Sequence, residues 1–200
     1  MDAPRESTTD RVESFSEGVF AVAITLLVLN LSVHAAAGQL GNGLLHEWPH
    51  YATYVVSFLT VGIIWMNHHS QFERVERTDR TMMLLNLVLL MFVTLIPFPT
   101  GLLASHLRTP SDQEVAAAVY AGTLLAMGLA FFATYIWAMR AGLFAEWVSQ
   151  RHMSYYRRRN ATGLLVYVAA LGVAFVNAPA SLALCGLTAI YYALPGKRLA

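Results

Sequence analysis

Long apolar runs separated by short charged segments are the feature of this sequence that most restricts its fold. Of the 200 residues, 56% are hydrophobic and only 12% are charged, about half the charged fraction of an ordinary soluble domain. A helix of about 20 apolar residues is long enough to cross a bilayer. The pattern therefore predicts an all-α, multi-pass membrane protein. The net charge of +1 indicates no nucleic-acid partner.

Six apolar segments are expected to cross the membrane as one helical bundle, so that residues 1–200 form a single domain. The segments lie at about 15–33, 51–69, 82–104, 115–139, 161–177 and 180–194. The last two are the shortest, and only Asn177, Ala178 and Pro179 separate them, which predicts a tight helical hairpin. Pro97 and Pro99 interrupt the third segment near one end, where a kink or an early stop is expected.

The basic residues indicate how the predicted helices are oriented. With the N-terminus assigned to the cytoplasm, every one of the 13 Lys and Arg residues except Arg108 falls on the cytoplasmic side. Both termini and the loops after the second and fourth segments are therefore predicted to be cytoplasmic. The predicted location is the cell membrane, with the lipid bilayer as a partner.

This topology brings two polar clusters to the same depth near the cytoplasmic ends of the first two helices. The first segment carries Ser16 and Glu17 there, and the second carries Asn67 and His68. A buried carboxylate is costly unless it is paired, so hydrogen bonds between the two clusters are predicted to latch the helices together. We interpret the latch as a structural link that holds the two helices together. The alternative is that it takes part directly in ion transit.

Arg11 lies one helical turn before Phe15. Residues four apart share one side of a helix, so the guanidinium is expected to pack over the Phe15 ring or to reach an acid such as Glu13.

Four residues of the first segment form a stripe along one face of the predicted helix. Their offsets from the first are three, four and seven residues, and they are Val22, Thr25, Leu26 and Leu29. An apolar stripe on a membrane helix usually packs against a neighbour. If several copies of the helix surround an axis, the stripe instead forms aliphatic rings that gate by dewetting, with a ring of Thr25 hydroxyls beside them.

The charged start of the first segment resembles an element of a known family. The run Arg11-Val12-Glu13-Ser14-Phe15-Ser16-Glu17 is similar to the Arg-x-x-x-Phe-Ser-Asp element of the bacterial branch of the transmembrane protein 175 family. Further residues resemble that family in both segments, namely Gly18, Ala21, Thr25, Leu26 and Leu29 in the first and the cluster Trp65, Asn67 and His68 in the second.

The resemblance implies a potassium-permeable cation channel in a bacterial plasma membrane. It implies a homotetramer in which the first helix of each subunit lines the pore, and passive transport of K⁺ and other monovalent cations without a cofactor. It places the hydrophobic constriction at Val22, Leu26 and Leu29, and the pore threonine at Thr25. We expect the ring of Thr25 hydroxyls to contribute more to any potassium preference than Val22 does. Two positions depart from the family: Glu17 replaces Asp, and Val22 stands where Ile or Leu is usual, which predicts a wider ring.

A proton-coupled or other secondary transporter is the alternative function. Such proteins usually carry ionisable residues near the middle of the membrane. Here the acids near the apolar segments, such as Glu17 and Glu114, lie at segment ends. This placement favours the channel.

A membrane metalloenzyme is the other alternative, because the chain contains seven histidines. The predicted topology divides them between the two sides, with His68 and His69 adjacent on one helix. Adjacent residues on a helix point about 100° apart and do not easily hold one ion. No catalytic residue and no metal site is therefore expected. The outer histidines are predicted to be solvated, with metal binding or a pH effect on conductance as alternatives; they are His34, His46, His50 and His106.

Other polar and small residues are predicted to be structural. Four are expected to form hydrogen bonds between helices, namely Ser57, Thr60, Asn86 and Asn177, and three to allow close helix approach, namely Gly122, Gly128 and Gly172. The run Arg157 to Arg159 is expected to determine topology and to contact anionic headgroups.

Overall fold

The chain folds into a bundle of helices, as the apolar segments predict. The computed structural model describes residues 8–32 and 37–193. Its elements are α1 (Thr8–Leu26), the 3₁₀ helix η1 (Leu27–Asn30), α2 (Leu40–His46), α3 (Trp48–Phe72), α4 (Arg80–Leu95), α5 (Pro97–His106), α6 (Gln113–Arg140), α7 (Gln150–Ala174) and α8 (Ala178–Ala193). The all-α class is thus confirmed for the described residues.

The predicted segments correspond to these helices with some changes of boundary. α1 begins seven residues before the predicted start at residue 15 and continues as η1. The third segment is divided between α4 and α5 at Ile96, because Pro97 has no N–H to continue the helical hydrogen bonds. The interruption predicted there is confirmed. α2 was not predicted, and residues 33 and 194, at two predicted segment ends, lie outside the described residues.

Three stretches of the described residues are long and apolar enough to cross a membrane. They are Thr9–Asn30, Arg80–His106 and Gln113–Arg140, and the apolar helix α8 is shorter. α7 differs because its first ten residues include four arginines, and its apolar part begins only near residue 161. These features support a membrane protein, and a crossing by each of six helices stays a prediction.

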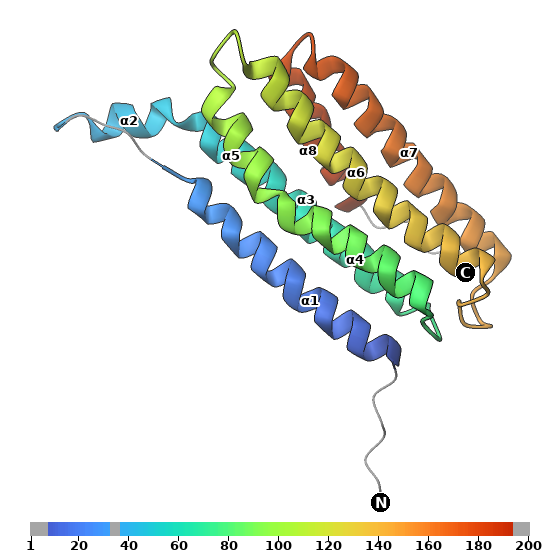
Figure 1. The fold of residues 1–200 in the computed structure, drawn as a ribbon. Coiled ribbons are helices and arrows are strands. Elements are labelled where there is room, and N and C mark those ends of the chain that lie inside the picture. Colours follow the sequence, from blue (N-terminus) through green and yellow to red (C-terminus); the bar gives the residue numbers. More distant parts are fainter. Residues whose placement is uncertain (1–7, 33–36, 194–200) are drawn as a thin grey trace, which may run out of the picture.

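The helices other than α2 lie side by side, with α1 at one edge of the bundle and α7 at the opposite edge, and α2 projects from one end (Figure 1). α6 packs against α4, α5, α7 and α8, whereas α1 packs mainly against α3 and α4. Small residues allow these contacts: a Cβ added to Gly128 would lie 3.0 Å from Leu164, and Gly163 lies directly against the Tyr192 ring. Close approach is confirmed at Gly128 but not at Gly172, which faces open space.

A buried hydroxyl cluster joins the three helices α3, α5 and α6. The Oγ of Ser57 lies 2.7 Å from Oγ1 of Thr100 and 2.9 Å from the hydroxyl of Tyr120. The predicted inter-helix role of Ser57 is therefore confirmed. Thr60 instead donates to the carbonyl of its own helix at Val56, and Asn177 accepts from the backbone N–H of Ala180 at the start of α8. Both of those predictions were wrong, because local carbonyl and N–H groups compete for short polar side chains.

The two ends of the bundle differ in charge. At the basic end, the loops after α3 and α6 pair through the bridge between Val75 and Phe144, and the Arg74 guanidinium lies 4.3 Å from the Tyr156 ring centre. At the opposite end, Arg108 contacts His46, the last residue of α2. The described basic residues other than Arg108 lie at or near the basic end, as predicted, and Arg5, Lys197 and Arg198 lie outside the described residues.

Candidate functional site

α1 has one buried face and one exposed face. Residues at helical spacing on the buried face pack into the bundle, namely Ser16, Phe20, Ala23 and Leu27. The other face carries the predicted stripe, of which Val22 is 56%, Leu26 42% and Leu29 75% exposed. The stripe is therefore unpartnered within the described part of one subunit. It is available to lipid, to another subunit or to a pore.

Thr25 provides the polar group within this stripe. Its side chain is exposed, and its Oγ1 donates to the carbonyl of Val22 at 2.8 Å. Because the hydroxyl proton is used within the helix, the oxygen keeps acceptor capacity for a cation on the exposed face. Leu29 lies in η1 rather than in an α-helix, but residues three apart are eclipsed in a 3₁₀ helix, so Leu29 stays in line with Leu26.

The last residue of η1 attaches this helix to the rest of the bundle. Nδ2 of Asn30 donates to the carbonyl of Pro97 at 2.9 Å. Gly101 makes room for this contact, since a Cβ added there would lie 2.5 Å from Oδ1 of Asn30. Neither Asn30 nor Gly101 was predicted as a site residue. The amide at the end of an apolar segment was the only signal in the sequence.

The predicted latch between Ser16 and His68 exists, but a third helix carries it. Nε2 of His68 donates to Oδ1 of Asn86 at 2.9 Å, and Nδ2 of Asn86 donates to Oγ of Ser16 at 2.8 Å. Ser16 completes the chain by donating to the carbonyl of Val12 at 2.8 Å. The direct hydrogen bond predicted between Ser16 and His68 was wrong, because the side-chain amide of Asn86 on α4 lies between them. The predicted inter-helix role of Asn86 is confirmed.

Glu17 and Asn67 do not take part in this latch. Asn67 donates to the carbonyl of Ile63 on its own helix, and Glu17 instead faces His69, with 3.5 Å between Oε1 and Nδ1. The indole of Trp65 stacks on the same imidazole at a ring distance of 6.2 Å. Sequence reasoning therefore identified the correct depth for Glu17 but the wrong partner, since His68 and His69 point in different directions around α3.

Arg11 and Phe15 lie on the exposed face near the start of α1. Both line a shallow groove together with Met83 and Leu87 of α4. Their side chains are exposed, Phe15 to 57%. No ion pair of Arg11 with Glu13 and no cation–π contact with Phe15 is present among the described residues, so the pairing predicted for Arg11 is not confirmed.

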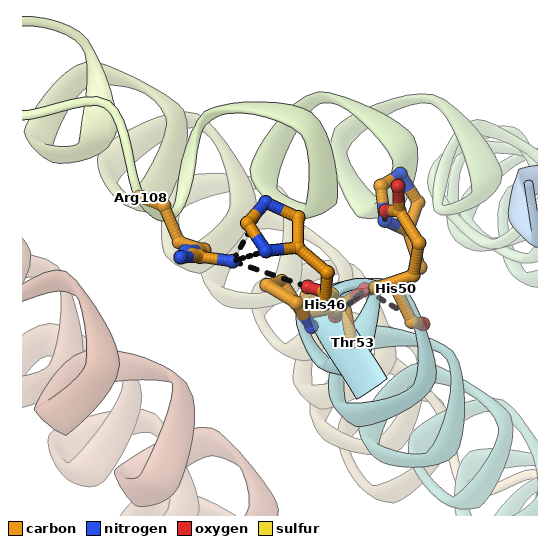
Figure 2. Close-up of polar contacts among 6 residues, drawn as sticks. His46, His50, Thr53 and Arg108 are labelled. Carbon is orange, nitrogen blue, oxygen red and sulfur yellow. Dashed lines mark hydrogen bonds and ion pairs between the residues drawn. The ribbon is translucent and has the colours of Figure 1, made fainter. Parts of the chain in front are cut away.

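The outer histidines make contacts within the subunit (Figure 2). Nη1 of Arg108 lies 2.9 Å from Nδ1 of His46 and 3.2 Å from its carbonyl oxygen. Nδ1 of His50 lies 2.8 Å from a carboxylate oxygen of Glu47. His46 and His50 are thus not simply solvated, as was predicted: His46 joins the end of α2 to Arg108 after α5, and His50 pairs with Glu47 at the start of its own helix α3. His34 lies outside the described residues.

Comparisons with known proteins agree in fold and in family. A family model described as endosomal/lysosomal potassium channel TMEM175 matches residues 11–97, which include α1 to α4 almost entirely. A Streptomyces collinus protein named a potassium channel is 49% identical over 187 residues, covering 91% of this chain and 90% of that protein. A Chamaesiphon minutus protein with the same description is 39% identical over 97% of this chain and 98% of its own length.

A solved structure extends the likeness to three dimensions. The crystal structure of a lysosomal potassium-selective channel TMEM175 homolog from Chamaesiphon minutus has a TM-score of 0.85 at 37% identity, and the match covers 94% of this chain and 97% of that one. Sequence and fold thus agree over nearly the whole length, and we conclude that this chain belongs to the TMEM175 family.

Proposed function

We propose that this chain is a potassium channel of the cell membrane that conducts K⁺ passively. The relatives that match almost its full length are named potassium channels, and the matched crystal structure is that of a potassium-selective channel. Ion channels are not enzymes, and the site is accordingly one of permeation. K⁺ is the permeant ion, other monovalent cations are further candidates, and no cofactor is proposed.

The exposed stripe of α1 is the observation that carries this proposal. Val22, Leu26 and Leu29 cover about 10 Å of helix length without a partner among the described residues of their own subunit, while the opposite face of α1 is packed. We propose a homotetramer in which four copies of this face surround the axis. The stacked aliphatic rings would then form a constriction that excludes water until it opens.

Thr25 is the residue proposed to favour potassium. It interrupts the aliphatic rings with a hydroxyl oxygen that faces away from the subunit. A ring of such oxygens can replace part of the water that an ion loses in a narrow pore. A stripe that only contacted lipid would gain nothing from this hydroxyl, which favours the pore over the lipid interpretation.

The orientation of the channel follows from its charges. We propose that the basic end lies in the cytoplasm, that six helices cross the membrane, and that both termini are cytoplasmic. The difference between the two ends of the bundle supports this arrangement, since Arg108 is the described basic residue at the opposite end. The inter-helix link of Ser16, Asn86 and His68 would then lie near the inner pore mouth, and Arg11 and Phe15 beside it.

A secondary transporter is less well supported. The buried hydroxyl cluster of Ser57, Thr100 and Tyr120 contains only neutral groups. Among the described acidic residues, Glu17 lies near the middle of α1, but it is 41% exposed and faces His69 near the end of α3, and the others lie near helix ends or in loops. The described core therefore offers no carboxylate at mid-depth for proton coupling.

Bi-ionic recording tests the proposed function. Purified protein is placed in a planar bilayer with K⁺ on one side and Na⁺ on the other, and the reversal potential is measured. A current that reverses on the potassium-selective side is expected. A correctly folded oligomer that never conducts, or that moves K⁺ only with a proton gradient, would remove the channel assignment.

A further inference from the structure

Three carboxylates surround the imidazole of His69 at the basic end of the bundle. Nδ1 of His69 lies 2.8 Å from Oε1 of Glu13 and 3.5 Å from Oε1 of Glu17. On the other side of the ring, Nε2 lies 3.6 Å from Oε1 of Glu73. One imidazole nitrogen thus faces two carboxylates, and the other faces the third.

The group is assembled by packing between two helices. Glu13 and Glu17 are one turn apart on the same side of α1, and His69 is supplied by α3, 56 residues from Glu13. The stacked indole of Trp65 restricts the orientation of the imidazole. The side chains of Glu13, Glu17 and His69 are 18%, 41% and 45% exposed, so the group is held in place and still reachable from solvent.

No Arg or Lys side chain in the described part of the chain balances the charges of this group. Like charges one helical turn apart destabilise a helix, and Glu13 and Glu17 form such a pair. Among the described residues, the ion pairs of Glu13, Glu17 and Glu73 all go to His69, and no Arg or Lys lies within ion-pair distance of them. A neutral imidazole leaves three negative charges together, which favours a bound cation.

We propose that Glu13, Glu17 and Nδ1 of His69 bind a divalent transition-metal ion. Two carboxylate oxygens and an imidazole nitrogen are suitable ligands for Zn²⁺ or Mn²⁺. Two ligand atoms of a tetrahedral zinc site lie about 3.4 Å apart, given bonds of about 2.1 Å. The donor atoms here all lie within 4.8 Å of one another, so side-chain rotations without backbone movement bring them into range.

Glu73 has a separate role in this site. It faces Nε2, the ring nitrogen that does not point at the two ligand carboxylates. A carboxylate at that position holds the imidazole as the tautomer whose Nδ1 is free to bind metal. Glu73 is therefore a positioning residue. No metal site was predicted from the sequence, because Glu13 and Glu17 come close to His69 only when α1 packs against α3.

Calorimetric titration of the purified oligomer with Zn²⁺, and separately with Mg²⁺, tests the site without any need for ion conduction. The wild type is expected to bind one high-affinity Zn²⁺ per chain and to show no comparable Mg²⁺ binding, because imidazole prefers zinc. His69→Gln and Glu17→Gln are expected to abolish that one ion per chain. The matched controls His152→Gln and Glu114→Gln, which alter the same residue types elsewhere, are expected to bind as the wild type does.

Glu73→Gln keeps the test decisive if a ligand variant fails to fold. It is expected to retain the site with a Zn²⁺ affinity about 10- to 100-fold weaker, as for other outer partners of metal ligands. Equal Zn²⁺ binding by the wild type and His69→Gln would overturn the proposal. Mg²⁺ binding as tight as Zn²⁺ binding would also overturn it. The group would then attract any divalent cation through its negative charge and would not be a site for a transition metal.

Discussion

The side-chain amide of Asn86 donates a hydrogen bond of 2.8 Å to Oγ of Ser16, in a buried contact between α4 and α1. The same amide accepts from His68 of α3, so a single side chain joins three helices. This link fixes which face of α1 is turned into the bundle. It thereby fixes the opposite face, with Val22 and Thr25, on the outside of the subunit.

Asn86→Ala is expected to destabilise the protein by about 1–3 kcal/mol, because Ser16 loses a donor and His68 is left with no hydrogen-bond partner in a buried position. Asn67→Ala is the matched control, since Asn67 bonds only to a carbonyl of its own helix. Thermal unfolding of both variants in detergent measures the difference. Equal losses of stability would contradict the role given to Asn86.

Gly101→Ala is expected to weaken the attachment of η1, because the new methyl group would lie 2.5 Å from Oδ1 of Asn30. The loss should be small in an Asn30→Ala background, where that oxygen is gone. Gly172→Ala, which meets no atom within 4 Å, is the control and should be neutral or stabilising. A double-mutant cycle on melting temperatures checks the coupling, and strict additivity would show that the two residues do not interact.

Thr25→Ala is expected to lower the ratio of K⁺ to Na⁺ permeability, because it removes the hydroxyl oxygen from the proposed ring. Thr25→Ser keeps that oxygen and should keep most of the ratio. Thr123→Ala removes a threonine that bonds to its own helix in a similar way, but on α6, and should have no effect. Reversal potentials measure the three variants, and an unchanged ratio in Thr25→Ala would show that selectivity has another source.

Native mass spectrometry of the detergent-solubilised protein is expected to give four times the 22.0 kDa mass of one chain. The expectation rests on the unpartnered face of α1, which needs neighbours to become a pore lining. A stable monomer or dimer that still conducts would exclude a pore formed by four copies of α1.

The one-sided stripe of α1 could be predicted because helical periodicity alone places Val22, Thr25 and Leu26 together. The break at Pro97 was also predictable, since proline cannot continue the helical hydrogen bonds. A lone amide in an apolar segment was enough to predict that Asn86 bonds between helices. These features depend on local geometry or on a general cost of burying polar groups.

The partners of these groups could not be predicted in the same way. Ser16 and His68 were placed at the correct depth, but the rotation of each helix decides whether they meet directly or through Asn86. The rotation of α3 also decides that His69, rather than His68, faces the carboxylates of α1, with Glu13 as its nearest partner. The contact of Asn30 with Pro97 joins residues that are 67 apart, and no sequence pattern relates them.

The most direct test of the pore compares Val22→Asn with Val168→Asn in planar bilayers. Both valines are about half exposed, at 56% and 54%, but Val168 lies on α7 at the opposite edge of the bundle. A polar side chain in a hydrophobic constriction favours water, so Val22→Asn should raise the current while Val168→Asn leaves it at the wild-type level. Equal currents from the two variants and the wild type would contradict a pore lined by α1.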